Sequence, residues 1–215
     1  MLDLRLDCDN IKIRCTDHGG ATAVALVLGL PASLALARGR FWGRDTINTI
    51  LMSPMIVPGI VGGSSLFIFF LEVEFLTGWR LAGSSLGLII GHSLIALPWM
   101  IRLVTTALIG INPSVEEAAR SLGAGPLTVF FRVTLPVIKP GVIAGSLFAF
   151  VNSFIDLEKS LLLVGPDRTT LQIALLNYLE WNFDSTIGAV ATVQIALITV
   201  LLLITDRYAK LSRAF

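Results

Sequence analysis

Five long, mostly apolar runs limit what this chain can fold into. They cover residues 21–37, 46–71, 84–108, 141–164 and 186–205. Runs of about 20 apolar residues are long enough to cross the hydrocarbon core of a bilayer as helices. Only 14% of the 215 residues are charged, against about 25% in soluble globular proteins. The chain therefore lacks the charge to cover a water-facing surface, and we expect lipid to surround most of it.

The runs predict helices, because none of them alternates between polar and apolar residues as the strands of a membrane barrel do. We predict an all-α integral membrane protein, a bundle of about five transmembrane helices. Residues 18–215 are expected to form the transmembrane domain and residues 1–17 a polar N-terminal tail. Four prolines lie inside the runs and predict kinks. They are Pro31, Pro54, Pro58 and Pro98.

The distribution of Lys and Arg between alternate loops predicts the orientation, since cytoplasmic loops carry an excess of both residues. The loops that would face the outside contain only Arg80, Lys159 and Arg168. The opposite set, residues 38–45, 110–140 and 206–215, contains nine basic residues and is expected to be cytoplasmic. The nine are Arg38, Arg40, Arg44, Arg120, Arg132, Lys139, Arg207, Lys210 and Arg213.

Several function classes are excluded by what the sequence lacks. A net charge of +1 provides no basic footprint for nucleic acid. None of the four lysines follows a glycine, so the phosphate-binding GxxxxGK[ST] loop is absent. The HExxH motif is also absent, and Cys8 and Cys15 match no zinc spacing. We therefore predict no catalytic residue, cofactor or metal, and no enzyme activity in this chain.

The loop at residues 110–140 is too long for a simple connection and carries helix signals. Ser114 and Glu117 have the spacing of a capping box. Good helix formers follow, which predicts a short helix over 115–122. Gly123 is a natural C-terminal stop for it.

The same loop is predicted to contain a second short helix. Pro126 is suited to its first position, and Leu135 with Pro136 is expected to end it. The result is a helix-turn-helix elbow with small residues at Ala118 and Ala119, which another protein could approach closely. The alternative is an amphipathic elbow at the membrane interface with no partner.

The spacing within this loop resembles a known motif. Glu117-Ala118-Ala119, three residues, Gly123, nine residues and then 133–136 (VTLP) is similar to the EAA loop of the permease subunits of bacterial ABC importers. Val133 stands where that motif usually has Ile. The resemblance implies a coupling helix that sits in a groove of a cytoplasmic ATPase. The residues it assigns to coupling are Glu116, Glu117, Ala118, Ala119, Gly123, Leu135 and Pro136.

The resemblance extends from about residue 22 to the C-terminus. Residues 164–166 (VGP) and 178–180 (YLE) are most similar to the polyamine-type branch of these permeases. It implies an ATP-driven importer of a polyamine or related amine in the bacterial inner membrane, working by alternating access. The implied partners are a dimer of ATPase subunits, a second permease and a periplasmic or extracellular solute-binding protein. Such permeases usually have six spans, so we expect this chain to be one span short.

Ionisable residues inside spans are functional candidates, because burying a charge in hydrocarbon is costly. In a continuous helix Asn152, Asp156 and Lys159 would share one face. Asp156 and Lys159 could neutralise each other, or Asp156 with Asn152 could face the solute path. His92 is either a hydrogen-bonded interior residue or part of that path. Arg102 lies where its side chain can extend to the cytoplasmic headgroups.

A different class of function remains open. The chain could be a stand-alone secondary carrier or channel, driven by an ion gradient through Asp156 or His92. Association with an ATPase would separate the two hypotheses, because only an ABC permease requires that partner.

Overall fold

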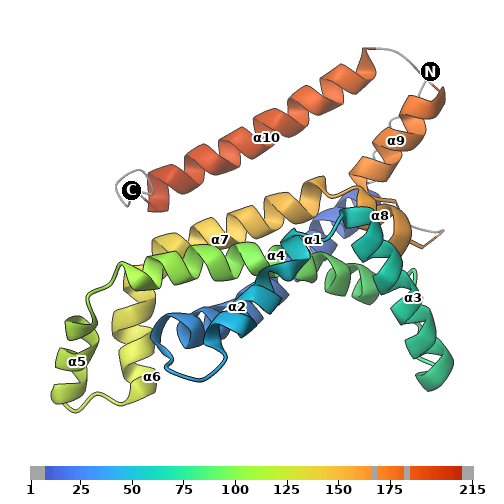
Figure 1. Cartoon of the computed structure of the whole chain (residues 1–215). Helices are drawn as coiled ribbons and strands as arrows, with labels where there is room; N and C mark the ends of the chain where they lie inside the picture. The colour runs from blue at the N-terminus through green and yellow to red at the C-terminus, as the bar shows by residue number, and fades with distance from the viewer. Residues whose placement is uncertain (1–7, 166–168, 182–184, 210–215) are drawn as a thin grey trace.

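In the computed structural model, which describes residues 8–165, 169–181 and 185–209, every regular element is a helix. This confirms the predicted all-α fold. Ten α-helices are joined by a 3-10 turn at Ser53–Met55 and a π-helical turn at Phe130–Thr134 (Figure 1). The α-helices are α1 (Cys8–Arg38), α2 (Arg44–Met52), α3 (Gly59–Thr77), α4 (Ser85–Ile109), α5 (Pro113–Ser121), α6 (Pro126–Val129), α7 (Leu135–Ile155), α8 (Glu158–Leu163), α9 (Leu171–Trp181) and α10 (Thr186–Ala209).

Five helical stretches of the described chain are long and apolar enough to cross a membrane, as the sequence predicts. Three agree closely with the expected runs, although α1 already begins at Cys8, inside the predicted polar tail. The five are Thr16–Arg38, Gly59–Thr77, Ser85–Ile109, Pro126–Ile155 and Thr186–Arg207.

The second span differs from the predicted run at 46–71. The chain forms α2 and the 3-10 turn, leaves the helical conformation before Pro58, and starts α3 at Gly59. Pro54 and Pro58 explain the break, because proline has no N–H to donate and disfavours helix at the residue before it. The membrane-spanning part is therefore shifted toward Thr77.

The fourth span also differs from its predicted bounds of 141–164. It begins at Pro126, passes through the π-helical turn into α7, and ends at Ile155. Asp156 is extended (ψ 112°), and α8 starts again at Glu158. The continuous helix that would have placed Asn152, Asp156 and Lys159 on one face is therefore interrupted.

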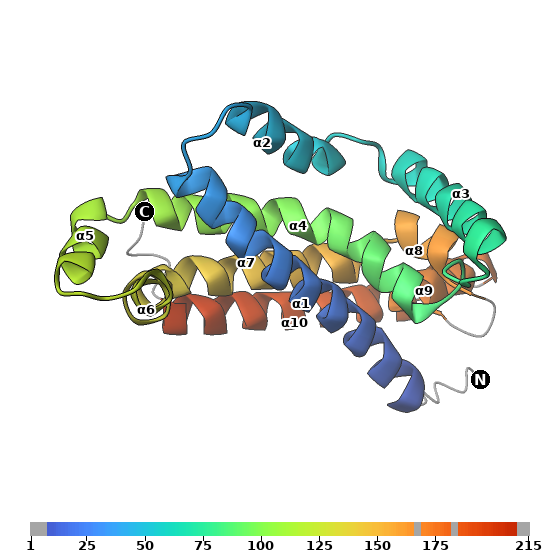
Figure 2. The same cartoon turned by 90° about the horizontal axis from the view of Figure 1, so that it is seen from below.

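Helix α4 lies at the centre of the fold, between α1 and α7 (Figure 2). Its buried side chains Met100, Val104 and Leu108 form the main core together with residues of α1 and α7. Glycines allow the close approach. A Cβ at Gly29 would overlap Met100, and one at Gly145 would lie 2.9 Å from the Met100 sulfur. Small residues at such contacts are typical of membrane helices, where packing rather than hydrophobicity holds helices together.

The outer helices are far less covered than this core. None of the most apolar stretch of α10 is buried within the chain, and only 11% of that of α3 is. Helix α3 is anchored at its start, where Gly63 packs against Lys159 and Leu162 of α8. The exposed faces of α3 and α10 consist of large apolar side chains such as Phe75 and Val193. Lipid or another membrane protein must cover them.

The loops separate into two ends of the molecule. Figures 1 and 2 show the α1–α2 connection, the turn from α5 to α6 and the last turn of α10 toward one end. The start of α1, the α3–α4 turn, α8 and α9 lie toward the other. We call the first the basic end, because most of the nine basic loop residues lie in its segments. Lys210 and Arg213 lie outside the described residues.

The α4–α7 contact generates a stability prediction. Gly145→Val should lower the free energy of unfolding by about 1–3 kcal/mol, the usual cost of overpacking a filled site, because the new side chain would collide with Met100. Thermal unfolding of the purified protein in detergent measures the change. Gly188→Val is the matched control, since a Cβ at Gly188 meets nothing within 4 Å. Equal melting temperatures for the two variants would contradict the proposed packing.

Candidate functional site

The loop between α4 and α7 forms the predicted elbow. Helix α5 begins at Pro113, and the side chain of Asn112 caps it by accepting a hydrogen bond from the Ser114 N–H at 3.1 Å. The prediction that Ser114 caps the helix is therefore wrong, because the observed cap, Asn112, lies two residues earlier. Gly123 ends the helix in the left-handed region (φ +84°), where glycine is favoured. This stop agrees with the sequence prediction.

The return into the membrane differs from the prediction. Helix α6 starts at Pro126 as expected, but Leu135 and Pro136 do not end it. They form the first turn of α7 directly after the π-helical turn, where the missing N–H of Pro136 leaves a carbonyl of that turn without its helical partner. The π-helical turn joins α6 to α7 without a break. In Figures 1 and 2 the axis of α6 is turned sharply from that of α7, so the second arm joins the fourth span through a bend at the π-helical turn.

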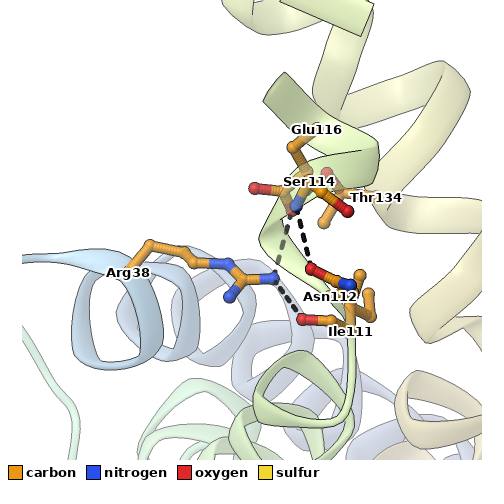
Figure 3. A network of polar contacts seen from close by, with 6 residues as sticks. All are labelled: Arg38, Ile111, Asn112, Ser114, Glu116 and Thr134. Carbon is orange, nitrogen blue, oxygen red and sulfur yellow. Dashed lines mark hydrogen bonds and ion pairs between the residues drawn. The ribbon is translucent and has the colours of Figure 1, made fainter. Parts of the chain in front are cut away.

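Glu116 anchors the elbow to the transmembrane helices (Figure 3). Its Oε1 accepts a hydrogen bond from Thr134 Oγ1 at 3.0 Å and lies 3.5 Å from Nη2 of Arg38, the last residue of α1. Arg38 Nη2 also donates to the carbonyl of Ile111 at 3.4 Å. The Glu116 residue is only 7% exposed. One carboxylate therefore connects α5, the end of α1 and the start of the fourth span.

The opposite side of α5 is exposed and carries apolar groups. Val115, Ala118 and Leu122 follow one helical stripe, and Leu122 is 90% exposed. Leu127 of α6 is 72% exposed. We call the set Val115, Glu117, Ala118, Leu122 and Leu127 the elbow surface. Exposed apolar side chains gathered around a charge are typical of a protein interaction site.

The predicted coupling residues therefore fall into two groups. Glu117, Ala118, Gly123 and Pro136 are exposed, and Ala119 and Leu135 are half-buried. Glu116 is buried on the inner side of α5. Only the outer group could touch a second protein directly.

Both histidines of the chain lie together near the other end of the bundle. His18 of α1 and His92 of α4 are buried, with ring centroids 5.1 Å apart. His18 Nδ1 lies 2.8 Å from Ser153 Oγ, and His92 Nε2 lies 3.1 Å from Ser160 Oγ. Of the two readings of His92, the interior, hydrogen-bonded one matches this geometry. These contacts connect α1, α4, α7 and α8 inside the membrane.

Asp156 lies at the break between α7 and α8. Its Oδ2 accepts a hydrogen bond from the Lys159 N–H at 3.0 Å, and its Oδ1 lies 3.5 Å from Lys159 Nζ. Both side chains are largely buried, at 14% and 13% exposure. Asn152 is half-buried and, within the described ranges, makes no side-chain hydrogen bond. The pairing of Asp156 with Lys159 is therefore present, and Asn152 is the uncommitted polar group beside it.

Sequence reasoning missed His18, Arg38 and Thr134 as site residues. His18 is adjacent to the polar tail, and only its rarity in an apolar chain could have drawn attention to it. In the sequence Arg38 is one of several basic residues in a loop. Its ion pair with Glu116 joins residues 78 positions apart, and no local pattern announces such a contact.

Comparison with known proteins identifies the class. The family model of the binding-protein-dependent transport system inner membrane component matches residues 26–212. The chain therefore belongs to this family of ABC importer permeases and is a multi-pass protein of the inner membrane.

Two curated relatives and one solved structure illustrate the similarity. The chain is 33% identical over 173 residues to the putrescine transport system permease protein PotI of Escherichia coli (strain K12), covering 80% of this chain and 62% of PotI. It is 29% identical over 210 residues to the molybdenum transport system permease protein ModB of the same strain, covering 90% of this chain and 89% of ModB. An inward-facing structure of the MetNI methionine ABC transporter has a similar fold, with a TM-score of 0.74, 19% identity and 94% coverage of both chains.

The Glu116 contacts generate a second prediction. Glu116→Gln should destabilise the protein by about 1.5–3 kcal/mol, the range for hydrogen bonds to charged groups, because Arg38 loses its counter-charge. The exposed neighbour supplies the control, and Glu117→Gln should leave the melting temperature unchanged. If the two variants melt alike, Glu116 does not anchor the elbow.

Proposed function

We propose that this chain is one permease subunit of an ATP-driven importer that carries a small solute inward by alternating access. The observation that carries the proposal is the elbow at the basic end. The outer surface of its helix α5 is apolar and exposed. The inner side is fixed to two spans through Glu116. Membership of the importer permease family supports the same conclusion.

The energy for transport is proposed to come from a separate subunit. The sequence has no GxxxxGK[ST] loop, and such a loop is the usual cradle for nucleotide phosphates. Two copies of a cytoplasmic ATPase would bind at the basic end. A groove of one ATPase subunit would receive the elbow surface of this chain. Glu117 and Ala118 would lie at the centre of that contact, and Ala119 and Gly123 beside it.

The geometry supports a specific route for the coupling. Movement of α5 would pull on Arg38 and Thr134 through Glu116, and thus on α1 and the fourth span together. The second arm bends at the π-helical turn, but its backbone stays helical into α7 through Leu135 and Pro136. Rigid connected elements transmit a displacement that a flexible loop would absorb.

The remaining partners follow from the exposed surfaces. The apolar faces of α3 and α10 are proposed to contact a second permease subunit and membrane lipid. The opposite end, with the α3–α4 turn and α9, would receive a periplasmic or extracellular solute-binding protein. The importer permease family and the fold of the MetNI transporter chain support this assembly.

For the solute we propose a polyamine or related small amine. The similarity to the putrescine permease PotI supports an amine as the solute. Asp156 supplies a carboxylate inside the membrane. Because Lys159 already neutralises Asp156, a cationic solute would bind by replacing the Lys159 ammonium group. Asn152 and His92 are the other candidates for the path, and of these Asn152 is the more exposed.

The elbow surface generates a prediction about the ATPase. Ala118→Trp should abolish co-purification of an ATP-hydrolysing subunit, because the indole would hold the two surfaces apart, while the amount of chain in the membrane stays normal. Ala35→Trp, on an exposed part of α1, is the matched control and should retain the subunit. Retention by Ala118→Trp would contradict the elbow surface as the contact. ATP-independent transport without any ATPase would favour the secondary carrier instead.

Asp156 generates a prediction about transport. Asp156→Asn keeps an oxygen that can accept the Lys159 N–H but removes the negative charge, so uptake of a labelled diamine into whole cells should fall roughly tenfold or more. Glu158→Gln removes the exposed neighbouring charge and should transport normally. Normal uptake by Asp156→Asn would restrict Asp156 to its structural pairing with Lys159.

A further inference from the structure

A polar pocket of about 360 Å³ lies at the basic end, between the last turn of α1, helix α2 and the end of α4. The elbow does not contribute to it. Its polar lining comes from α2 on one side and α4 on the other, and the side chains are Arg44, Asp45, Asn48, Arg102, Thr105 and Thr106.

The pocket holds more hydrogen-bond donors than the protein uses. Arg44 is fixed in place, because its Nε donates to the carbonyl of Leu36 at 2.6 Å and leaves both terminal nitrogens free. In the described part of the chain, the Arg102 guanidinium has neither an ion-pair nor a hydrogen-bond partner. The hydroxyl oxygen of Thr105 is buried without a partner. Arg44 and Arg102 are exposed, so the Thr105 hydroxyl is the unsatisfied buried group of the pocket. Because such groups are rare and costly, it favours a ligand that accepts hydrogen bonds.

The charge of the pocket selects an anion. Two guanidinium groups face one carboxylate, Asp45, which leaves a net charge of +1. Arg40 lies just before α2 and adds to the positive potential of this end. Guanidinium groups bind phosphate oxygens with particular preference because of their planar, multiple donors.

The surroundings show where a phosphate would come from. Trp42 is 99% exposed and Phe41 is 40% exposed in the connection that leads into α2, and aromatic side chains of this kind are enriched at the membrane–water interface. Helix α2 turns Arg44 and Asn48 into the pocket, while Ile47 and Ile50 on its other side are exposed. An amphipathic helix with this layout lies in the headgroup region.

From these observations we propose that the pocket between α2 and α4 binds the phosphate of an anionic phospholipid headgroup from the cytoplasmic leaflet. Basic pockets between transmembrane helices on the cytoplasmic side are suited to such headgroups. Arg102 and Arg44 bind the phosphate oxygens, and Thr105 and Asn48 donate hydrogen bonds around them. The acyl chains follow the apolar side of α2. This site is independent of the elbow and of the identity of the transported solute.

Native mass spectrometry of the full chain, extracted from membranes with the subunits that accompany it, tests the proposal. The wild-type protein should retain phosphatidylglycerol in preference to phosphatidylcholine when both are supplied in mixed micelles. Arg102→Gln should lower the bound fraction about fivefold, the effect of one basic group near an anionic surface. Arg132→Gln removes an exposed charge outside the pocket and should retain lipid like the wild type.

A second variant protects the test against simple misfolding, because it predicts a gain. Asp45→Asn raises the net charge of the pocket and should increase phosphatidylglycerol retention, whereas loss of structure would decrease it. Inorganic phosphate at equal concentration should not displace the lipid. Equal retention of phosphatidylcholine, displacement by inorganic phosphate, unchanged retention in Arg102→Gln or no gain in Asp45→Asn would each overturn the assignment.

Discussion

The close contact of α4 with α1 and α7 is the constraint on which the rest of the structure depends. Lipid is as apolar as the helix surfaces, so helix association in a membrane relies on tight packing and on hydrogen bonds. Gly29 and Gly145 both let their helices approach Met100, and Ser33 Oγ donates to the Gly29 carbonyl within α1 and lies 3.3 Å from the carbonyl of Ile101 on α4. With this trio in place, α3 and α10 can remain largely uncovered and available to lipid and to partner subunits.

Polar groups fix the trio at both ends. Toward one end, His18 and His92 meet Ser153 and Ser160, which ties α1, α4, α7 and α8 together. At the basic end, Glu116 joins Arg38 to Thr134. A force on α5 therefore reaches α1 and the fourth span through one carboxylate, in addition to the chain connections to α4 and α7. The outward-facing surface and its anchor are therefore directly connected in α5. Glu117 belongs to the exposed surface, and its neighbour Glu116 is the buried anchor.

The sequence predicts the helical class, the five spans and the elbow because these depend on local signals: long apolar runs, Pro126 at a helix start and Gly123 at a helix end. Prediction from the sequence is wrong where contacts between distant segments determine the structure. The break at Asp156 coincides with the packing of α8 against α3, which lies about 100 residues earlier in the chain. The Arg38–Glu116 pair and the meeting of His18 with His92 also join distant segments. The coupling set could be named from its spacing, but its division into an inner anchor and an outer surface required the fold.

The central claim, that the elbow surface contacts an ATP-hydrolysing subunit, is tested most directly by cross-linking in living cells. A photoactivatable residue in place of Leu122, the most exposed apolar side chain of the elbow, should form an adduct that contains a nucleotide-binding protein. The same probe in place of Trp79, exposed in the α3–α4 turn at the opposite end, should not. If the probe at Leu122 captured no nucleotide-binding protein while the chain was present at normal levels in the membrane, the account would be contradicted.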